Sequence, residues 1–192
     1  MRTLLIVLLL AAGPAFSADL PPRAQALLDR GRPYVDVEPD PDGRSGAILA
    51  VIDVAAPQAV VWDVMTDCEL APKMVANLKS CRVLERDPQG RWDIREEVTR
   101  ATFTPSVRTV YREDFEPNHR MAFHRTGGDL KVFEGEWRLE PHGDQVRVTY
   151  RARVAAPFSA PGWVARLALR RDVPLALLAL RREALARARQ TP

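Results

Sequence analysis

The chain has 192 residues, a formal net charge of +3 at pH 7 and 46% hydrophobic residues. A length of this order suits one domain with a sizeable core. The arginines are scattered and do not form the aromatic and basic pattern of a nucleic-acid-binding surface, so we expect no nucleic acid as a partner.

The N-terminus has the order of a secretory signal peptide. Arg2 supplies a positive start, 4–12 is an apolar run, and 14–18 is rich in small residues. The apolar run is too short to span a membrane, which needs about 20 residues. The sequence therefore predicts removal of 1–18, by cleavage after Ser17 or Ala18, and a periplasmic or secreted mature protein.

The chain has two cysteines, Cys68 and Cys81. In an exported protein an even number of cysteines favours a disulfide, and we predict that these two are bonded. A zinc site needs four ligands, and the histidines, His119, His124 and His142, have no ligand-like spacing. We therefore expect neither a metal nor a cofactor.

Turn and helix-start signals divide 19–78 into a short helix, a hairpin and two further short helices. The expected bounds are 19–31 for the first helix, 34–37 and 47–54 for the strands, a helix beginning at Pro57, and 67–78 for the last helix or helical turn. We expect Pro72 to interrupt this last helix. The helix that begins at Pro57 has an apolar stripe of Val60, Val61, Val64 and Met65.

The second half of the chain alternates apolar and charged residues, most clearly over 133–139 and 146–154, which a Pro-Gly turn joins. The expected strands are 82–86, 92–99, 107–116, 121–126, 133–139 and 146–154. A helix over 163–189 follows, and Pro174 should kink it. We expect one α+β domain over 33–190, preceded by an N-terminal extension over 19–32. Its sheet would be curved, antiparallel and wrapped around the long C-terminal helix.

Four segments match the pattern of a known superfamily. They are Ala55-Ala56-Pro57 with Val60, Val61 and Trp62; Thr66-Asp67 with Leu70; Phe133, Gly135, Trp137 and Leu139; and Arg170-Arg171-Asp172-Val173-Pro174 with Leu177-Leu178. On these segments the chain, over roughly 33–190, resembles the START-like or SRPBCC helix-grip superfamily. It is most similar to the polyketide cyclase/dehydrase and coenzyme-Q-binding START-type members. Export, and Cys68 where relatives often carry an aromatic residue, depart from the coenzyme-Q-binding pattern.

The resemblance implies a deep apolar cavity between sheet and terminal helix, which holds lipids, quinones, polyketides or other apolar molecules. Alternation along the strands predicts which residues line it. The expected ligand-binding residues are Trp92, Ile94, Tyr111, Phe123, Phe133, Trp137 and Tyr150 from strands, and Trp163, Leu167 and Leu178 from the helix. Along 107–116, Tyr111 shares its face with Glu113. A cavity smaller than about 300 Å³ would favour a closed core over a binding site.

The sequence predicts an exported carrier of an apolar small molecule or lipid rather than an enzyme. No serine or cysteine has a base and an orienting group in the pattern of a hydrolase. The first alternative is a polyketide cyclase or dehydratase, for which Glu96 is the candidate acid or base because it shares a strand face with Trp92 and Ile94. Pairing of Glu96 with an arginine is the other interpretation of that residue. The second alternative is an interaction module whose core is filled by its own side chains.

The terminal helix is rich in arginine, with leucines at helical spacing. One interpretation is a core stripe with a solvated basic back. The other is an amphipathic helix that also contacts anionic lipid headgroups at a membrane surface. Both interpretations are compatible with the monomer that we expect.

Overall fold

The computed structural model describes residues 20–39, 46–100, 105–157 and 162–190. Four helices and eight strands follow one another in this part of the chain. Their order is α1 (Pro22–Leu28), β1 (Tyr34–Pro39), β2 (Gly46–Val54), α2 (Gln58–Thr66), α3 (Ala71–Met74), β3 (Leu78–Arg86), β4 (Trp92–Thr99), β5 (Val107–Glu116), β6 (Arg120–Gly128), β7 (Val132–His142), β8 (Gln145–Ala155) and α4 (Gly162–Ala188). None of the helices in the described ranges is both long and apolar enough to cross a membrane.

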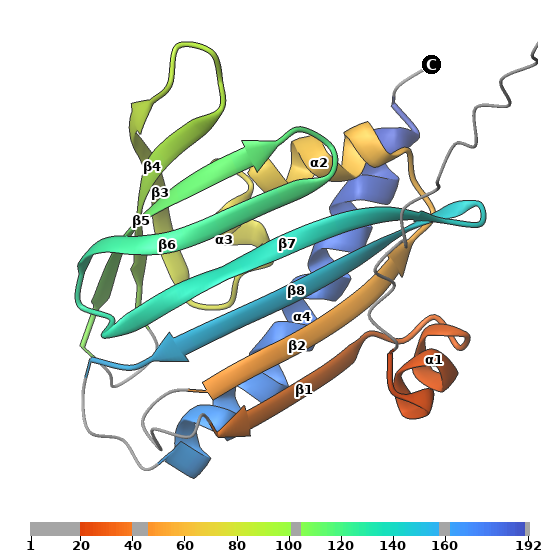
Figure 1. The fold of residues 1–192 in the computed structure, drawn as a ribbon, viewed down its shortest axis with the longest axis horizontal. Helices are drawn as coiled ribbons and strands as arrows, with labels where there is room; N and C mark the ends of the chain where they lie inside the picture. Colours follow the sequence, from red (N-terminus) through yellow and green to blue (C-terminus); the bar gives the residue numbers. More distant parts are fainter. Residues whose placement is uncertain (1–19, 40–45, 101–104, 158–161, 191–192) are drawn as a thin grey trace, which may run out of the picture.

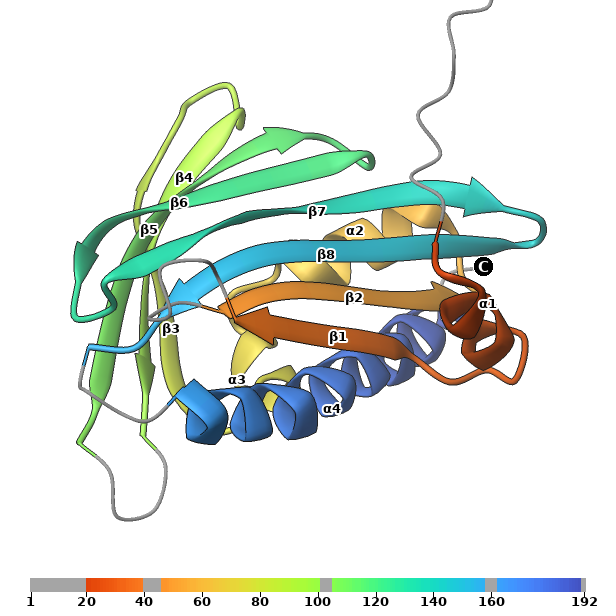
Figure 2. The same ribbon diagram turned by 60° about the horizontal axis from the view of Figure 1, so that its bottom comes forward.

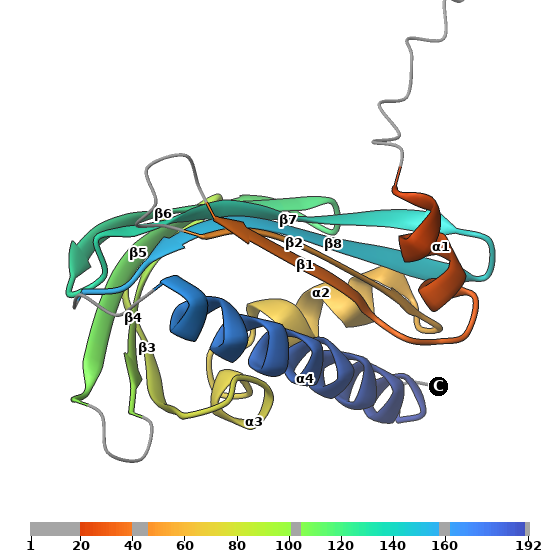
Figure 3. The same ribbon diagram turned by 90° about the horizontal axis from the view of Figure 1, so that it is seen from below.

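The strands form one antiparallel sheet in the order β1-β2-β8-β7-β6-β5-β4-β3 (Figure 1). Neighbours in the chain pair as hairpins, except that β2 pairs with β8 and so brings the two halves of the molecule together. The sheet is strongly curved, and its β3–β5 end turns toward the side on which α4 lies (Figure 3). This curvature creates a concave face with room for a helix.

The long helix α4 runs along the concave face, with α2 and α3 beside it (Figures 2 and 3). The inward residues of β2, among them Ile48, Ile52 and Val54, meet Leu177 and Leu180 of α4 in the main core. Every second residue of a strand faces the same side of the sheet, so the alternation in β2 places its apolar side chains under the helix. Burial of this apolar surface is the main stabilising contribution to the fold.

The short helix α1 packs on the opposite, convex face near the edge strand β1 (Figure 3). Ala24 and Leu28 of α1 form a small second core with Tyr34 and Val51. Arg147 of β8 is close by and pairs with Asp53 of β2 at 2.8 Å. Helix α1 therefore packs against the sheet through its apolar residues.

The expected fold class is confirmed: the molecule is an α+β helix-grip structure. The expected bounds of β4 and β5 are correct, and the other six strands are longer than expected. One expectation about α3 is wrong: Pro72 does not interrupt it but lies in its first turn, where a missing N–H is tolerated. Pro174 lies inside α4, which runs without a break from Gly162 to Ala188, and the kink at Pro174 stays a prediction. The expected signal peptide, 1–18, lies outside the described residues.

The predicted disulfide between Cys68 and Cys81 is present, with the two Cα atoms 5.4 Å apart. Cys68 lies between α2 and α3, and Cys81 lies in β3. The bond therefore closes a loop that contains the whole of α3. A loop of this length stabilises the folded state by roughly 3 kcal/mol in the chain-entropy description.

Candidate ligand-binding site

A cavity of about 230 Å³ lies on the concave side of the sheet, between the strands and the helices α2, α3 and α4. We call it the inner cavity. Its lining residues are Met65, Ala71, Met74, Val75, Arg95, Glu97, Tyr111, Glu113, Met121, Phe123, Phe133, Trp137, Tyr150, Ala176 and Leu180. Most of these side chains are apolar or aromatic, as in binding sites for small organic molecules.

Five aromatic side chains from four neighbouring strands form one wall of the inner cavity. They are Tyr111, Phe123, Phe133, Trp137 and Tyr150, and all five belong to the residues predicted from alternation. Their rings contact one another: the centroids of Trp137 and Tyr150 are 4.2 Å apart, and those of Phe123 and Phe133 are 4.8 Å apart. The cavity therefore offers a continuous aromatic surface to a ligand with rings or an apolar chain.

Gly135 makes this aromatic packing possible. It lies opposite Phe123 in the pairing of β6 with β7, between the inward residues Phe133 and Trp137. A Cβ atom at Gly135 would lie 2.9 Å from Cζ of Phe123 and 2.1 Å from the carbonyl oxygen of Arg151. Only glycine leaves room for the Phe123 ring to lie over β7. This accounts for the glycine in the middle of the Phe133, Gly135, Trp137 pattern.

The other end of the inner cavity is polar and contains charged groups of β4 and β5. Arg95 is buried, and its Nε donates to both carboxylate oxygens of Asp93, at 3.0 and 3.2 Å. Nη2 of Arg95 donates to the carbonyl oxygen of Thr66 at 2.8 Å. Tyr111 donates its hydroxyl to Glu97 at 2.9 Å. We call Asp93, Arg95, Glu97 and Glu113 the polar cluster.

Glu113 differs from the other members of the polar cluster in its hydrogen bonding. Its side chain is 5% exposed and lines the inner cavity. Its Oε2 lies 2.9 Å from Nε of Arg95 but accepts no hydrogen bond, because that N–H is directed at Asp93. A buried oxygen without a hydrogen bond is costly, and such atoms in folded proteins call for an explanation.

Burial also changes the protonation of this end of the cavity. It raises the pKa of Glu113 to about 8, with Arg95 opposing the rise and the carboxylates of Asp93 and Glu97 adding to it. The pKa of Glu97 is raised for the same main reason, and the Tyr111 hydroxyl and Arg95 oppose that rise. Glu113 is therefore a protonated acid near neutral pH and loses its proton just above it.

Sequence reasoning placed the wrong face of β4 toward the cavity. Trp92 and Ile94 do not line it, and Arg95 and Glu97 do. Trp92 instead lies under the guanidinium of Arg112, 4.4 Å from the ring centroid. The apolar residues of β4 were expected inside because inward residues are usually apolar, but here the inward residues are charged and stabilise one another.

The expectation that Glu96, the candidate acid, faces the cavity is therefore also wrong. Its carboxylate is held by the guanidinium groups of Arg82 and Arg108, both of which are more than half exposed. Their hydrogen bonds lower the pKa of Glu96. The pairing with arginine, which was the other interpretation of Glu96, is the correct one. Glu113 lies in the inward position instead. The sequence indicated only that it shares a strand face with Tyr111.

The helix residues that line the inner cavity also differ from those expected. Ala176 and Leu180 of α4 face it. Leu178 lies beside a different hollow, next to α1 and β1, and Leu167 is 65% exposed. Successive helix residues point about 100° apart, so a shift of two positions changes the face completely. The side chain of Trp163 lies outside the described residues.

The volume of the inner cavity, about 230 Å³, is below the value of about 300 Å³ expected of a binding site. On that criterion the structure is closer to a filled core. Oε2 of Glu113 favours a binding site instead, because a buried oxygen that accepts no hydrogen bond is costly in a closed core. The cavity in this structure has the volume of roughly eight water molecules, which is enough for a small organic ligand.

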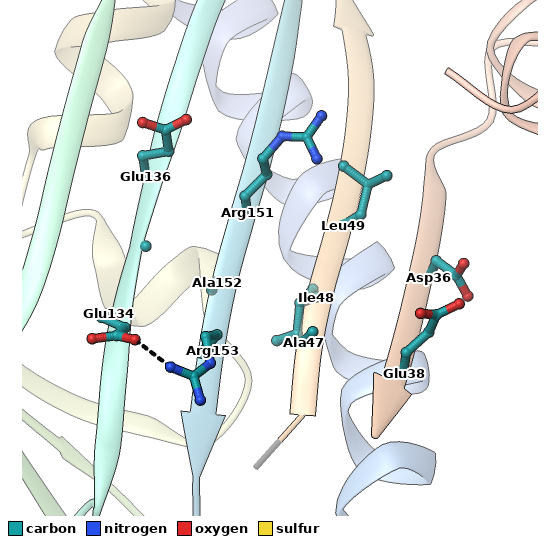
Figure 4. A pocket seen from close by; sticks show the side chains of 11 residues that line it. Asp36, Glu38, Ala47, Ile48, Leu49, Glu134, Glu136, Arg151, Ala152 and Arg153 are labelled. Carbon is teal, nitrogen blue, oxygen red and sulfur yellow. Dashed lines mark hydrogen bonds and ion pairs between the residues drawn. The ribbon is translucent and has the colours of Figure 1, made fainter. Parts of the chain in front are cut away.

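A larger hollow, of about 710 Å³, lies over β1, β2, β8 and β7. Figure 4 shows its charged side chains projecting from the strands on the side away from α4, which lies behind them. Its charged lining residues are Asp36, Glu38, Glu134, Glu136, Arg151 and Arg153, with Glu134 and Arg153 paired at 2.8 Å. Charged side chains around a hollow on the convex face suit an apolar ligand less well than the inner cavity does.

Residues 54–181, about two thirds of the chain, match the family described as polyketide cyclase / dehydrase and lipid transport. No curated protein sequence matches the chain.

Many solved structures share the fold. A STAR-related lipid transfer protein from Xanthomonas axonopodis has a TM-score of 0.67 and 17% identity, over 79% of this chain and 93% of that chain. Human STARD10 has a TM-score of 0.64 and 16% identity, over 80% and 69% of the two chains. The Zhui aromatase/cyclase from Streptomyces sp. R1128 has a TM-score of 0.58 and 16% identity, over 76% and 94%. Identities this low show a common fold alone.

Proposed function

The chain belongs to the polyketide cyclase/dehydrase and lipid transport family, and on that premise we propose that it binds and carries an apolar small molecule or lipid in the inner cavity. The observation that carries this proposal is the continuous aromatic wall of the cavity, opposite apolar residues of α3 and α4. An aromatic wall gains dispersion energy with ligands that have rings or isoprenoid chains. We propose that the protein does this as a monomer.

A lipid-sized ligand needs more space than the cavity offers at present, and α3 is the element best suited to move. It has four residues, none of them buried, and it contributes Met74 to the cavity wall. Displacing so short a helix exposes little apolar surface, whereas displacing α4 would open the main core. The disulfide between Cys68 and Cys81 limits how far α3 can move.

Binding can be tested with Nile red, an uncharged apolar fluorophore, and with two matched variants of α4. Ala176 lines the cavity, and Ala168 is exposed on the same helix. Ala176→Leu should fill part of the cavity and weaken Nile red binding at least tenfold, and Ala168→Leu should leave it unchanged. Equal binding by both variants, with the fold verified by circular dichroism, would show that the dye binds elsewhere and that the cavity is not the site.

The second candidate function is an enzyme of the cyclase or dehydratase type. The observation in its favour is Glu113, a buried acid with a pKa of about 8 that lines the cavity. A general acid or base contributes about 10²–10⁴-fold to a rate. Turnover of a polyketide-like substrate that Glu113→Gln abolishes while binding persists would favour this function over a carrier.

We propose that the protein acts outside the cytoplasm, after removal of 1–18. The disulfide supports this, because oxidising compartments favour such bonds. The exposed basic back of α4, with Leu167 and Leu175 on its surface, supports peripheral contact with anionic membranes. Cell fractionation should recover a protein whose intact mass lacks 17 or 18 N-terminal residues, partly on membranes and released by high salt. Recovery of the full-length chain in the cytoplasm would reject export.

A further inference from the structure

We propose that the polar end of the inner cavity binds the protonated amine of an otherwise apolar ligand, with Glu113 as the acceptor of its hydrogen bond. This inference rests on the proposed function, since it concerns the same cavity. It names the chemical class of the ligand as a lipophilic amine. Its basis is the geometry of the polar cluster and of the aromatic wall.

The first argument is the unused acceptor. Oε2 of Glu113 is buried at the cavity wall and accepts no hydrogen bond within the described structure. Nε of Arg95 lies 2.9 Å from this oxygen as its ion-pair partner, but it donates its N–H to the two oxygens of Asp93. The Tyr111 hydroxyl donates to Glu97. A ligand that brings its own N–H donor into the cavity would therefore give Oε2 the hydrogen bond that the nearby donors of the protein do not provide.

The second argument is charge. Three carboxyl groups, those of Asp93, Glu97 and Glu113, lie around one guanidinium, that of Arg95. No second cation of the described residues lines the inner cavity. Deprotonation of all three carboxyl groups would leave an excess of two negative charges in a poorly solvated place. A ligand ammonium group supplies the missing positive charge, whereas a fatty-acid carboxylate would add to the excess.

The third argument is the aromatic wall next to the polar cluster. Tyr111 belongs to the wall and donates its hydroxyl to Glu97 of the polar cluster, and its ring centroid lies 5.0 Å from that of Phe133. Electron-rich ring faces attract a cation, and the attraction grows where water is excluded. The same wall accommodates the apolar body of the ligand. An ammonium group is favoured over a metal ion, because no three His, Cys, Asp or Glu side chains of the described residues are grouped so that they could hold one.

The dependence of binding on pH follows from these groups. The charged and titratable groups facing Glu113 are Asp93, Arg95 and Glu97 from β4 and Tyr111 beside it on β5; the residues of α3 and α4 that line the cavity are uncharged. Because burial keeps Glu113 protonated up to pH 8, an arriving ammonium must displace that proton into solvent. Amine affinity should therefore rise between pH 6 and 8.5. It should fall again above the pKa of the free amine, about 10.

The test uses three probes of one shape on the full chain. They are 4-phenylbutylamine, 4-phenylbutanol and 4-phenylbutyrate, which share the ring and the carbon chain and differ at the polar end. At pH 8 the amine should bind about tenfold more tightly than the alcohol, because its hydrogen bond to Glu113 is charge-assisted. The carboxylate should bind most weakly of the three. In wild-type protein the amine affinity should rise with pH, and the alcohol affinity should not.

Glu113→Gln should abolish the preference for the amine and change alcohol binding by less than about threefold, since it preserves shape and removes the charge. Glu96→Gln, on the same pair of strands but on the other face, should keep the preference. Equal or tighter binding of the alcohol by the wild type overturns the amine assignment but leaves the carrier function standing. Persistence of the amine preference in Glu113→Gln overturns it as well. Failure of all three probes to bind at any pH overturns both.

Discussion

Glu113 is a buried carboxyl group beside two others, and the fold holds it at an energetic cost. Burial raises its pKa most, Asp93 and Glu97 add to the rise, and Arg95 opposes it only in part. Side chains of this kind are frequent at functional sites, because stability alone does not favour them. A glutamine in the same place would keep the volume and remove the proton equilibrium.

Glu113→Gln should therefore stabilise the protein, and increasingly so as the pH rises. The carboxyl group ionises near its ordinary pKa of 4.5 in the unfolded chain and near 8 in the folded one. Between these values the folded state binds more protons, so the free energy of unfolding of the wild type falls with rising pH. Glu113→Gln does not lose stability in this way. Its free energy of unfolding should therefore exceed that of the wild type by roughly 2–4 kcal/mol at pH 8.

Urea denaturation of both proteins at pH 5 and pH 8 measures this difference. The two should have similar stability at pH 5 and diverge at pH 8. A stability difference that is independent of pH would mean that Glu113 ionises normally. Glu96→Gln is the control: Arg82 and Arg108 lower the pKa of Glu96, so the wild-type carboxylate stabilises the fold above pH 4.5 and loses this contribution only as the pH falls below it. Glu96→Gln should therefore be less stable than the wild type by the same amount at pH 5 and at pH 8.

At the scale of elements, β4 shows what a sequence can and cannot reveal. Its bounds, Trp92–Thr99, follow from alternation alone. The face that turns inward does not, because both sets of residues alternate equally well. Arg95 is tolerated inside because Glu113 of the neighbouring strand and Asp93 of its own surround it. That compensation depends on the pairing of β4 with β5, which no single strand encodes.

The aromatic wall, by contrast, could be predicted. Phe123, Phe133, Trp137 and Tyr150 come from strands whose cavity-lining residues are apolar or aromatic. On these strands the usual rule that inward residues are apolar holds, and alternation alone identified the inward face. Tyr111 of β5 also faces inward, although the charged Glu113 shares its face. In α4 the sequence pattern does not distinguish the face that lines the cavity, since leucine and alanine occur on several faces of the helix.

The disulfide connects the ends of the segment that contains α3, and its loss should affect both stability and ligand exchange. Cys68→Ser with Cys81→Ser should lower the free energy of unfolding by roughly 3 kcal/mol. A freer α3 should also release Nile red faster, which stopped-flow fluorescence measures. Unchanged release from a destabilised variant would mean that α3 does not control access to the cavity.

At the scale of the whole molecule, the order of elements was enough to predict the fold. A hairpin, short helices, a run of antiparallel strands and a long final helix admit few compact arrangements, and a sheet curved around that helix is one of them. The volume of the cavity could not be predicted in this way. It depends on how closely α3 and α4 approach the sheet, which is decided by side-chain packing rather than by periodicity.

The central claim, that the inner cavity holds an apolar ligand, is tested most directly by native mass spectrometry of the protein after incubation with a total lipid extract. We predict a bound small molecule on the wild type and on Ala168→Leu, and its loss from Ala176→Leu, whose added side chain occupies the cavity. The bound species should be apolar and should carry an amine. A wild-type protein that takes up nothing from the extract, or an adduct that Ala176→Leu retains in full, would contradict the claim.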